Sequence, residues 1–188
     1  SRRRRPPRHR RALTSSAAMR VVGLVGRSGS GKTTLIEAVL PILAACGLRV
    51  STIKHSHKPL ALDIEGKDSF RHRAAGAHET LVAGRSGWAL HGGRPEHPPG
   101  LAALLGRLSP VDLVLVEGFG AESIPRAEIC RAARLSQPGG DPLWQDDPSI
   151  ATLITDAPAA MRAAGWCGTC LPLDDAGAVA AWLAATCG

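Results

Sequence analysis

Long apolar runs and an even set of cysteines are both missing from this chain. No stretch approaches the ~20 consecutive apolar residues that cross a membrane, and no signal-peptide core is visible. We therefore expect a cytoplasmic protein that does not associate with membranes. The five cysteines are odd in number and scattered, which argues against the disulfide framework of a secreted protein. Cys167 and Cys170 have the Cys-x-x-Cys spacing, for which redox or metal chemistry stays open beside idle thiols.

Acidic residues are absent from the segment Ser1–Ala18, which holds seven arginines and accounts for the net charge of +7. From Met19 onward, 16 basic residues balance 16 acidic ones, so nucleic-acid binding is not expected. The Arg- and Pro-rich segment Ser1–Ala18 has no apolar period, and we predict that it is disordered. Three interpretations stay open for it: residues upstream of a true start at Met19, a basic arm that binds anions, or an organelle presequence.

A glycine-rich stretch, from Gly26 to Thr33, matches the pattern G-x-x-x-x-G-K-[ST] of a phosphate-binding loop, or P-loop. An apolar, β-branched run precedes it and a helical pattern follows. Glycines let backbone N–H groups point inward, and a helix N-terminus adds partial positive charge. Lys32 is predicted to reach the β- and γ-phosphates, and the Thr33 hydroxyl to coordinate Mg²⁺. The predicted nucleotide-binding residues in this stretch are Gly26, Arg27, Ser28, Gly29, Ser30, Gly31, Lys32, Thr33 and Thr34.

Strand-like and helical patterns alternate after Met19, which predicts an α/β three-layer sandwich with the P-loop NTPase fold and a mostly parallel sheet. Residues 19–188 are expected to form one nucleotide-binding domain. The antiparallel exception is a β-hairpin predicted at Glu79–His91. The remaining strands are predicted at 21–25, 49–54, 111–116, 127–131 and 150–154, and the helices at 32–46, 68–75, 101–108, 157–164 and 176–185. Residues 136–148 are predicted to form a loop.

A second part of the nucleotide site is predicted where the apolar strand at 111–116 runs into Glu117 and Gly118. P-loop proteins place a carboxylate at such a strand end to hold Mg²⁺, directly or through water. The glycine lets the backbone approach the γ-phosphate closely. We therefore predict Lys32 and Glu117 as catalytic residues, and Glu117 as a metal ligand. No glutamine or histidine follows Glu117 closely to position water, so slow hydrolysis is expected.

The polar segment after the strand at 49–54 carries further candidates, because the carboxyl ends of parallel strands share one edge of the sheet with the P-loop. Asp63 and Asp68 are predicted to face Mg²⁺, and the alternative for this charged stretch is a capped, solvated helix. His55 and His57 have the chemistry of metal ligands, and the alternative is that they are surface groups.

Four blocks in this order resemble the family of molybdopterin-guanine dinucleotide biosynthesis protein B (MobB). They are Gly26–Leu35, Thr52–His55, the run from Gly66 to Ala77 that begins Gly-Lys-Asp-Ser, and Asp112–Phe119. Many phosphate-binding proteins share the first block, whereas the Lys-His and Gly-Lys-Asp-Ser blocks are more specific. The resemblance covers the chain from Met19 to its C-terminus.

The resemblance implies a GTP-binding P-loop protein with weak, Mg²⁺-dependent GTPase activity. It implies a homodimer that assists a nucleotidyltransferase, MobA, in attaching GMP to molybdopterin. Thr155 and Asp156 follow the strand where this class recognises guanine, and the Asp156 carboxylate would accept hydrogen bonds from the guanine N1–H and N2–H₂. The hairpin, with Trp88 exposed, is the predicted dimer contact. The chain departs from the family pattern at Lys58, Glu65 and Gly120, which leaves the nucleotide site intact but puts a pterin contact near residue 120 in doubt.

Two other functions fit the same motifs. A small P-loop kinase would use Arg71 and Arg73 in an arginine-rich lid, and phosphoryl transfer to a small molecule would identify it. A metallochaperone GTPase would use His55 and His57 with neighbouring histidines, and tight metal binding by the apo-protein would identify it.

Overall fold

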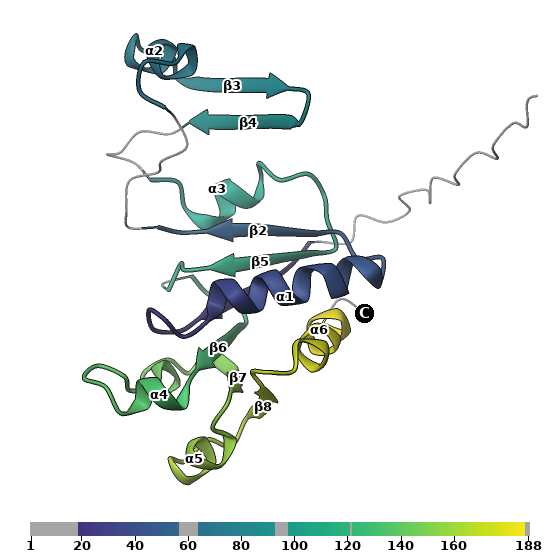
Figure 1. The fold of residues 1–188 in the computed structure, drawn as a ribbon, viewed down its shortest axis with the longest axis vertical. Helices are drawn as coiled ribbons and strands as arrows, with labels where there is room; N and C mark the ends of the chain where they lie inside the picture. The colour runs from purple at the N-terminus through teal and green to yellow at the C-terminus, as the bar shows by residue number, and fades with distance from the viewer. Residues whose placement is uncertain (1–18, 57–63, 93–97, 121, 187–188) are drawn as a thin grey trace, which may run out of the picture.

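The computed structural model describes residues 19–56, 64–92, 98–120 and 122–186 (Figure 1). Three sets of predictions lie outside the described residues: the disorder of Ser1–Ala18, the metal-ligand roles of His57 and Asp63, and the family departure at Lys58. Among the described residues, no helix is both long and apolar enough to cross a membrane.

A six-stranded parallel sheet forms the centre of the molecule, in the order β2-β5-β1-β6-β7-β8. Central β1 pairs with β5 on one side and with β6 on the other. Parallel strands covered on both faces need largely apolar side chains, and β1, β5 and β7 supply them. The expected α/β fold with a mostly parallel sheet is confirmed. The strands are β1 (Arg20–Val25), β2 (Val50–Lys54), β5 (Leu113–Glu117), β6 (Arg126–Cys130), β7 (Ile150–Thr155) and β8 (Thr169–Pro172).

Helices cover both faces of this sheet. α1 (Lys32–Ala45) and α6 (Ala176–Ala185) lie side by side on one face, where they pack on Leu24, Leu113 and Leu115 (Figure 1). On the other face, α3 (Leu101–Leu105) packs on alternate residues of β5, and α5 (Pro158–Ala163) packs on β7. The alternation of side chains along each strand thus divides the core into two layers.

Two short helical elements were not predicted, because neither is long enough to show a helical period. They are α4 (Ala132–Leu135) and the 3₁₀ turn η1 (Leu143–Gln145), which falls in the predicted loop. α3 is shorter than the predicted helix at 101–108 and ends before Gly106.

The predicted hairpin is present and forms a lobe apart from the main sheet (Figure 1). This lobe consists of α2 (Asp68–Ala74) and the hairpin of antiparallel strands β3 (Glu79–Gly84) and β4 (Gly87–Gly92). An ion pair of 2.7 Å between Arg107 Nη1 and Glu79 Oε1 connects β3 to the segment that follows α3.

Candidate functional site

The stretch from Gly26 to Gly31 forms a turn between β1 and the first residue of α1. Gly26, with φ of 149°, passes so close to β6 that a Cβ there would lie 2.5 Å from the Ile129 carbonyl oxygen. Ser30 is buried, and its N–H donates to the Arg27 carbonyl at 3.2 Å. The tight approach of β1 to β6 therefore requires glycine at position 26.

Lys32 begins α1 and turns back over the loop. Its Nζ donates to the carbonyl oxygens of Gly26 at 2.7 Å and Arg27 at 3.1 Å. Partial burial lowers the pKa of the Lys32 ammonium, and the nearby Glu117 carboxylate opposes that shift. Thr33 and Thr34 follow on the first turn of α1, where both are exposed.

Glu117 ends β5, the strand beside β1, and its carboxylate is only partly exposed. Its Oε2 lies 3.4 Å from Lys54 Nζ at the matching end of β2. Gly118 follows with φ of 97°, and a Cβ there would lie 2.7 Å from the Cβ of His55. Glycine at position 118 thus lets the chain after β5 pass directly beside the chain after β2.

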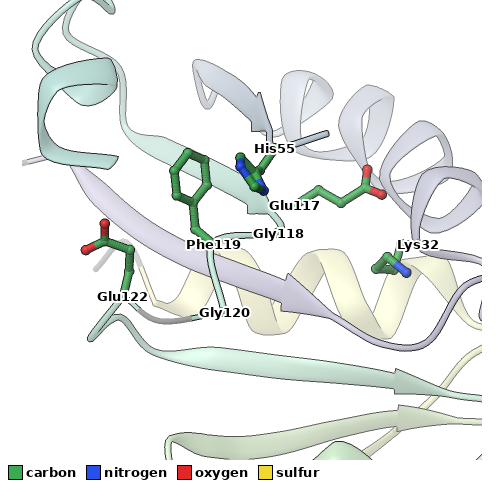
Figure 2. A pocket seen from close by; sticks show the side chains of 7 residues that line it. All are labelled: Lys32, His55, Glu117, Gly118, Phe119, Gly120 and Glu122. Atoms are coloured by element: carbon green, nitrogen blue, oxygen red, sulfur yellow. The ribbon is translucent and has the colours of Figure 1, made fainter. Parts of the chain in front are cut away.

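A cavity of about 430 Å³ opens between these strand ends and the P-loop. The ring centroids of His55 and Phe119 lie 4.8 Å apart, with the rings tilted by 48°. Figure 2 shows these two side chains on one side and Glu117 and Lys32 on the other. Phe119 has φ of 57°, a strained value for a residue with a side chain. The cavity brings together the predicted Lys32, Glu117, Gly118 and His55. Its lining residues are Lys32, His55, Glu117, Gly118, Phe119, Gly120 and Glu122.

Asp68 is not part of this cavity. It begins α2 in the hairpin lobe, where its Oδ1 lies 3.8 Å from Arg71 Nη1 (Figure 1). Arg73 of the same helix contacts the Phe70 ring and lies 3.0 Å from His91 Nε2, within the lobe. The structure therefore places Asp68 and both arginines away from Lys32 and Glu117.

No group of three or more His, Cys, Asp or Glu side chains that would hold a metal ion occurs in the described part of the chain. Cys167 and Cys170 are free; Cys167 is exposed, and Cys170 is half-buried in β8. No described contact thus favours either the metal alternative or the redox alternative.

Asp156 follows β7, as predicted, and contacts the residues that follow β6. Its Oδ1 accepts a hydrogen bond of 2.7 Å from the Ala132 N–H, and its Oδ2 lies 3.9 Å from Arg131 Nη1. The neighbouring Thr155 is buried, and its hydroxyl accepts the Ala157 N–H at 3.0 Å. Both predicted residues therefore stabilise the strand ends next to the P-loop.

Arg131 is a site residue that the sequence did not reveal. Its Nε donates to the Ser30 carbonyl at 3.0 Å, and its guanidinium covers Gly31, where a Cβ would lie 2.9 Å from Nη2. Arg131 follows β6, which lies next to β1 only in the folded sheet. An arginine after a strand indicates nothing until the strand order is known.

Glu128 is a second unpredicted residue, and it holds the loop beside the P-loop. Its side chain is almost fully buried and accepts the N–H groups of Leu143 at 2.8 Å and Trp144 at 3.0 Å. Burial raises the pKa of this carboxyl. Arg27 in turn donates from Nε to the Asp141 carbonyl at 3.3 Å. Glu128 and Arg27 therefore hold the loop after α4 next to the P-loop through hydrogen bonds.

A strand–P-loop–helix unit at the centre of a parallel sheet, with a carboxylate at the end of the adjacent strand, defines a class of protein. By its fold and its site, this chain has the α/β, P-loop NTPase-like architecture.

Comparisons with known proteins identify the family. Residues 21–156 match the family model of MobB, molybdopterin guanine dinucleotide synthesis protein B. The chain is 40% identical over 140 residues to the molybdopterin-guanine dinucleotide biosynthesis adapter protein of Haemophilus influenzae, an alignment that covers 73% of this chain and 75% of that protein. The chain belongs to the MobB family.

Two further relatives agree with this assignment. The Escherichia coli adapter protein is 44% identical over 107 residues, which is 55% of this chain and 61% of that protein. The crystal structure of Bacillus subtilis MobB superposes with a TM-score of 0.65 at 28% identity, covering 88% of this chain and 97% of that one.

Proposed function

We propose that this chain binds GTP with Mg²⁺ and acts in the cytoplasm as an adapter in the formation of molybdopterin guanine dinucleotide. Its partner would be a MobA-type guanylyltransferase, with molybdopterin as the acceptor of GMP. The observation that carries the proposal is the shared cavity of Lys32 and Glu117, which puts a cation of the P-loop and the strand-end carboxylate around one space. Family membership supplies the pathway.

The P-loop would bind the phosphates through its backbone N–H groups and through the N-terminus of α1. Lys32 is released from the Gly26 and Arg27 carbonyls to meet the β- and γ-phosphates. Gly118 permits the chain after β5 to approach the γ-phosphate. The remaining P-loop residues, Ser28, Gly29, Ser30 and Gly31, shape the turn.

Hard oxygen ligands suit Mg²⁺, and the Thr33 hydroxyl with the Glu117 carboxylate would supply them. When bound, Mg²⁺ neutralises charge on the phosphate oxygens. Asp68 lies in the hairpin lobe and does not line this cavity, and Asp63 falls outside the described residues, so the proposal assigns Mg²⁺ to Thr33 and Glu117. Hydrolysis is proposed to be slow, because no glutamine or histidine follows Glu117 closely to position the attacking water.

A homodimer would form through the hairpin. Leu81 and Trp88 lie on one face of the two-stranded sheet and are 60% and 67% exposed. Thr80 and His91 lie on the opposite face, where both are half-buried and Arg73 of α2 contacts His91. An open apolar face on a two-stranded sheet is typical of a contact surface, and a two-fold axis would pair it with itself.

Calorimetric titration of the full chain with GTP and ATP analogues, with and without Mg²⁺, tests the nucleotide proposal. We expect Mg²⁺-dependent, guanine-selective binding that is lost in Lys32→Ala. Arg85→Ala, at an exposed cation in the turn of the hairpin, is the matched control and should bind normally. Selective binding of ATP would contradict the proposal. A positive result leads to an assay of dinucleotide formation by a MobA-type enzyme with and without the chain.

A further inference from the structure

A second, smaller cavity lies on the other side of the P-loop. It has a volume of about 110 Å³ and is placed between α1, α6 and the segments that follow β6 and β8. Whole ligands occupy cavities of roughly 300–1,000 Å³, so this one suits a flat part of a ligand. Its lining residues are Gly31, Thr34, Leu35, Ala38, Arg131, Leu173, Asp174 and Ala176.

The positions of the two cavities give a bound nucleotide a direction. Lys32 and Glu117, which suit the terminal phosphates, line the larger cavity on the β5 side of the P-loop. Gly31 and Thr34, at the start of α1, line the smaller cavity on the β6–β8 side. A nucleotide with its γ-phosphate near Glu117 therefore extends its base into the smaller cavity.

Arg131 forms one wall of that cavity and is held in place. Its Nε donates a hydrogen bond to the Ser30 carbonyl, and its Nη1 forms an ion pair with the Asp156 carboxylate. A planar guanidinium fixed in this way is suited to pack against the face of an aromatic ring. Apolar side chains of α1 and of the segment after β8, Leu35 and Leu173, provide further contact with the ring.

The carboxylates near the cavity differ in what they already contact. Asp156 accepts the Ala132 N–H and faces Arg131, and Asp175 accepts the Ala178 N–H at the start of α6. The side chain of Asp174 is exposed at the cavity and makes no hydrogen bond or ion pair with any residue that the structure describes. Asp174 alone of the three has both oxygens available for a ligand.

We propose that Asp174 selects guanine in this cavity, while Arg131 packs against the face of the purine. The proposal rests on GTP being the ligand of the P-loop. The two oxygens of Asp174 accept hydrogen bonds from the guanine N1–H and N2–H₂, whereas adenine has no such pair of donors on this edge. Asp156 is then a positioning residue, which acts by orienting Arg131.

The experiment compares Asp174→Asn and Asp156→Asn by calorimetric titration of the full chain with GTP, ATP and xanthosine triphosphate. Xanthine has a carbonyl where guanine has its amino group, so an asparagine amide matches it as a carboxylate matches guanine. Asp146→Asn, at an exposed aspartate in the loop before β7, is the charge-matched control. The melting temperature of each variant reports whether it is folded.

We expect Asp174→Asn to lose the preference for GTP over ATP by about 10- to 100-fold, the discrimination typical of a bidentate contact to a base edge. The same variant should gain affinity for xanthosine triphosphate by about tenfold or more relative to the parent chain, a gain that misfolding cannot produce. Asp156→Asn and Arg131→Lys should weaken GTP and ATP binding to a similar extent, and Asp146→Asn should match the parent chain.

Three outcomes overturn the proposal. If the parent chain prefers GTP and Asp174→Asn keeps that preference without gaining xanthosine triphosphate, Asp174 does not select guanine, and the proposed function still stands. If Asp156→Asn alone loses the preference and gains xanthosine triphosphate, Asp156 selects guanine. A parent chain with no preference for GTP contradicts the proposed function itself, and with it the selection of guanine.

Discussion

Lys54 Nζ and Glu117 Oε2 lie 3.4 Å apart at the ends of paired strands, where Lys54 of β2 is in register with Glu117 of β5. The lysine side chain is exposed, whereas the Glu117 carboxylate is only 15% exposed at the cavity of the P-loop. The lysine ammonium thus occupies the neighbourhood of the carboxylate that we propose for Mg²⁺. The two cations compete for one anion.

Replacing Lys54 by methionine should therefore lower the Mg²⁺ concentration needed for half-maximal nucleotide binding. Because the Lys54 side chain is exposed, its ion pair contributes about 1 kcal/mol or less, and a shift of about two- to fivefold is expected. Titration of Mg²⁺ at fixed GTP measures it, with Arg85→Met at the hairpin turn as the control. A variant that needs more Mg²⁺ would show that Lys54 assists the metal site instead.

Replacing Gly26 by alanine should destabilise the fold by more than about 3 kcal/mol, because the new methyl group would lie 2.5 Å from the Ile129 carbonyl. Gly29 is the matched control. It also has a positive φ, of 76°, but a Cβ there meets no atom within 4 Å, so alanine should cost only about 1–2 kcal/mol. Urea unfolding of both variants measures the difference. Equal losses would mean that the backbone angle, and not the contact with β6, sets the requirement.

Glu128 should make the protein less stable as the pH rises. Burial raises the pKa of its carboxyl above the ordinary value of 4.5. Between that value and the raised one, the folded protein holds a proton that the unfolded chain has released. The free energy of unfolding therefore falls as the pH rises through this window.

The comparison with Glu128→Gln isolates this contribution, because glutamine does not ionise. The variant loses one of two acceptors for the Leu143 and Trp144 N–H groups, which should cost about 1–3 kcal/mol at every pH. The lowered pKa of Asp112 acts on both proteins alike. Urea unfolding from pH 4 upward should show the fall in the parent chain only. Parallel curves would rule out Glu128 as its source.

The open face of the hairpin should control the oligomeric state. Leu81→Ser combined with Trp88→Ser removes apolar area from the face proposed to pair in a dimer. We expect this double variant to be monomeric by light scattering after gel filtration. Val82→Ser, on the face toward α2, should leave the dimer intact. A parent chain that is itself monomeric at micromolar concentration would contradict the dimer.

The parts of the site that lie next to each other in the sequence could be predicted from it. The P-loop combines a strand, a glycine-rich turn and a helix in one continuous stretch, and Glu117 ends a strongly apolar strand, so both motifs were visible and both now line one cavity. The hairpin was predicted for the same reason, since its turn and its strands are local.

Residues whose roles depend on strand order could not be found in this way. Arg131 reaches Ser30 only because β6 lies beside β1, and Glu128 reaches Leu143 only because the loop after α4 folds back on β6. Asp68 shows the converse. Its motif resembles the family pattern, yet Asp68 begins α2 in the hairpin lobe, away from the P-loop. The local sequence pattern does not indicate this position.

The order of strands has a consequence for the way this chain folds during synthesis. β1 is synthesised before the other strands, but its partners in the sheet are β5 and β6. Val21 of β1 pairs with Val114 of β5, and Leu24 of β1 pairs with Ala127 of β6. Parallel pairings between such distant segments form late and slowly. The nascent P-loop therefore has no rigid frame until β6 has been made. A nucleotide phosphate would then bind only the finished sheet. It would stabilise the folded chain and have no effect on the early steps of folding.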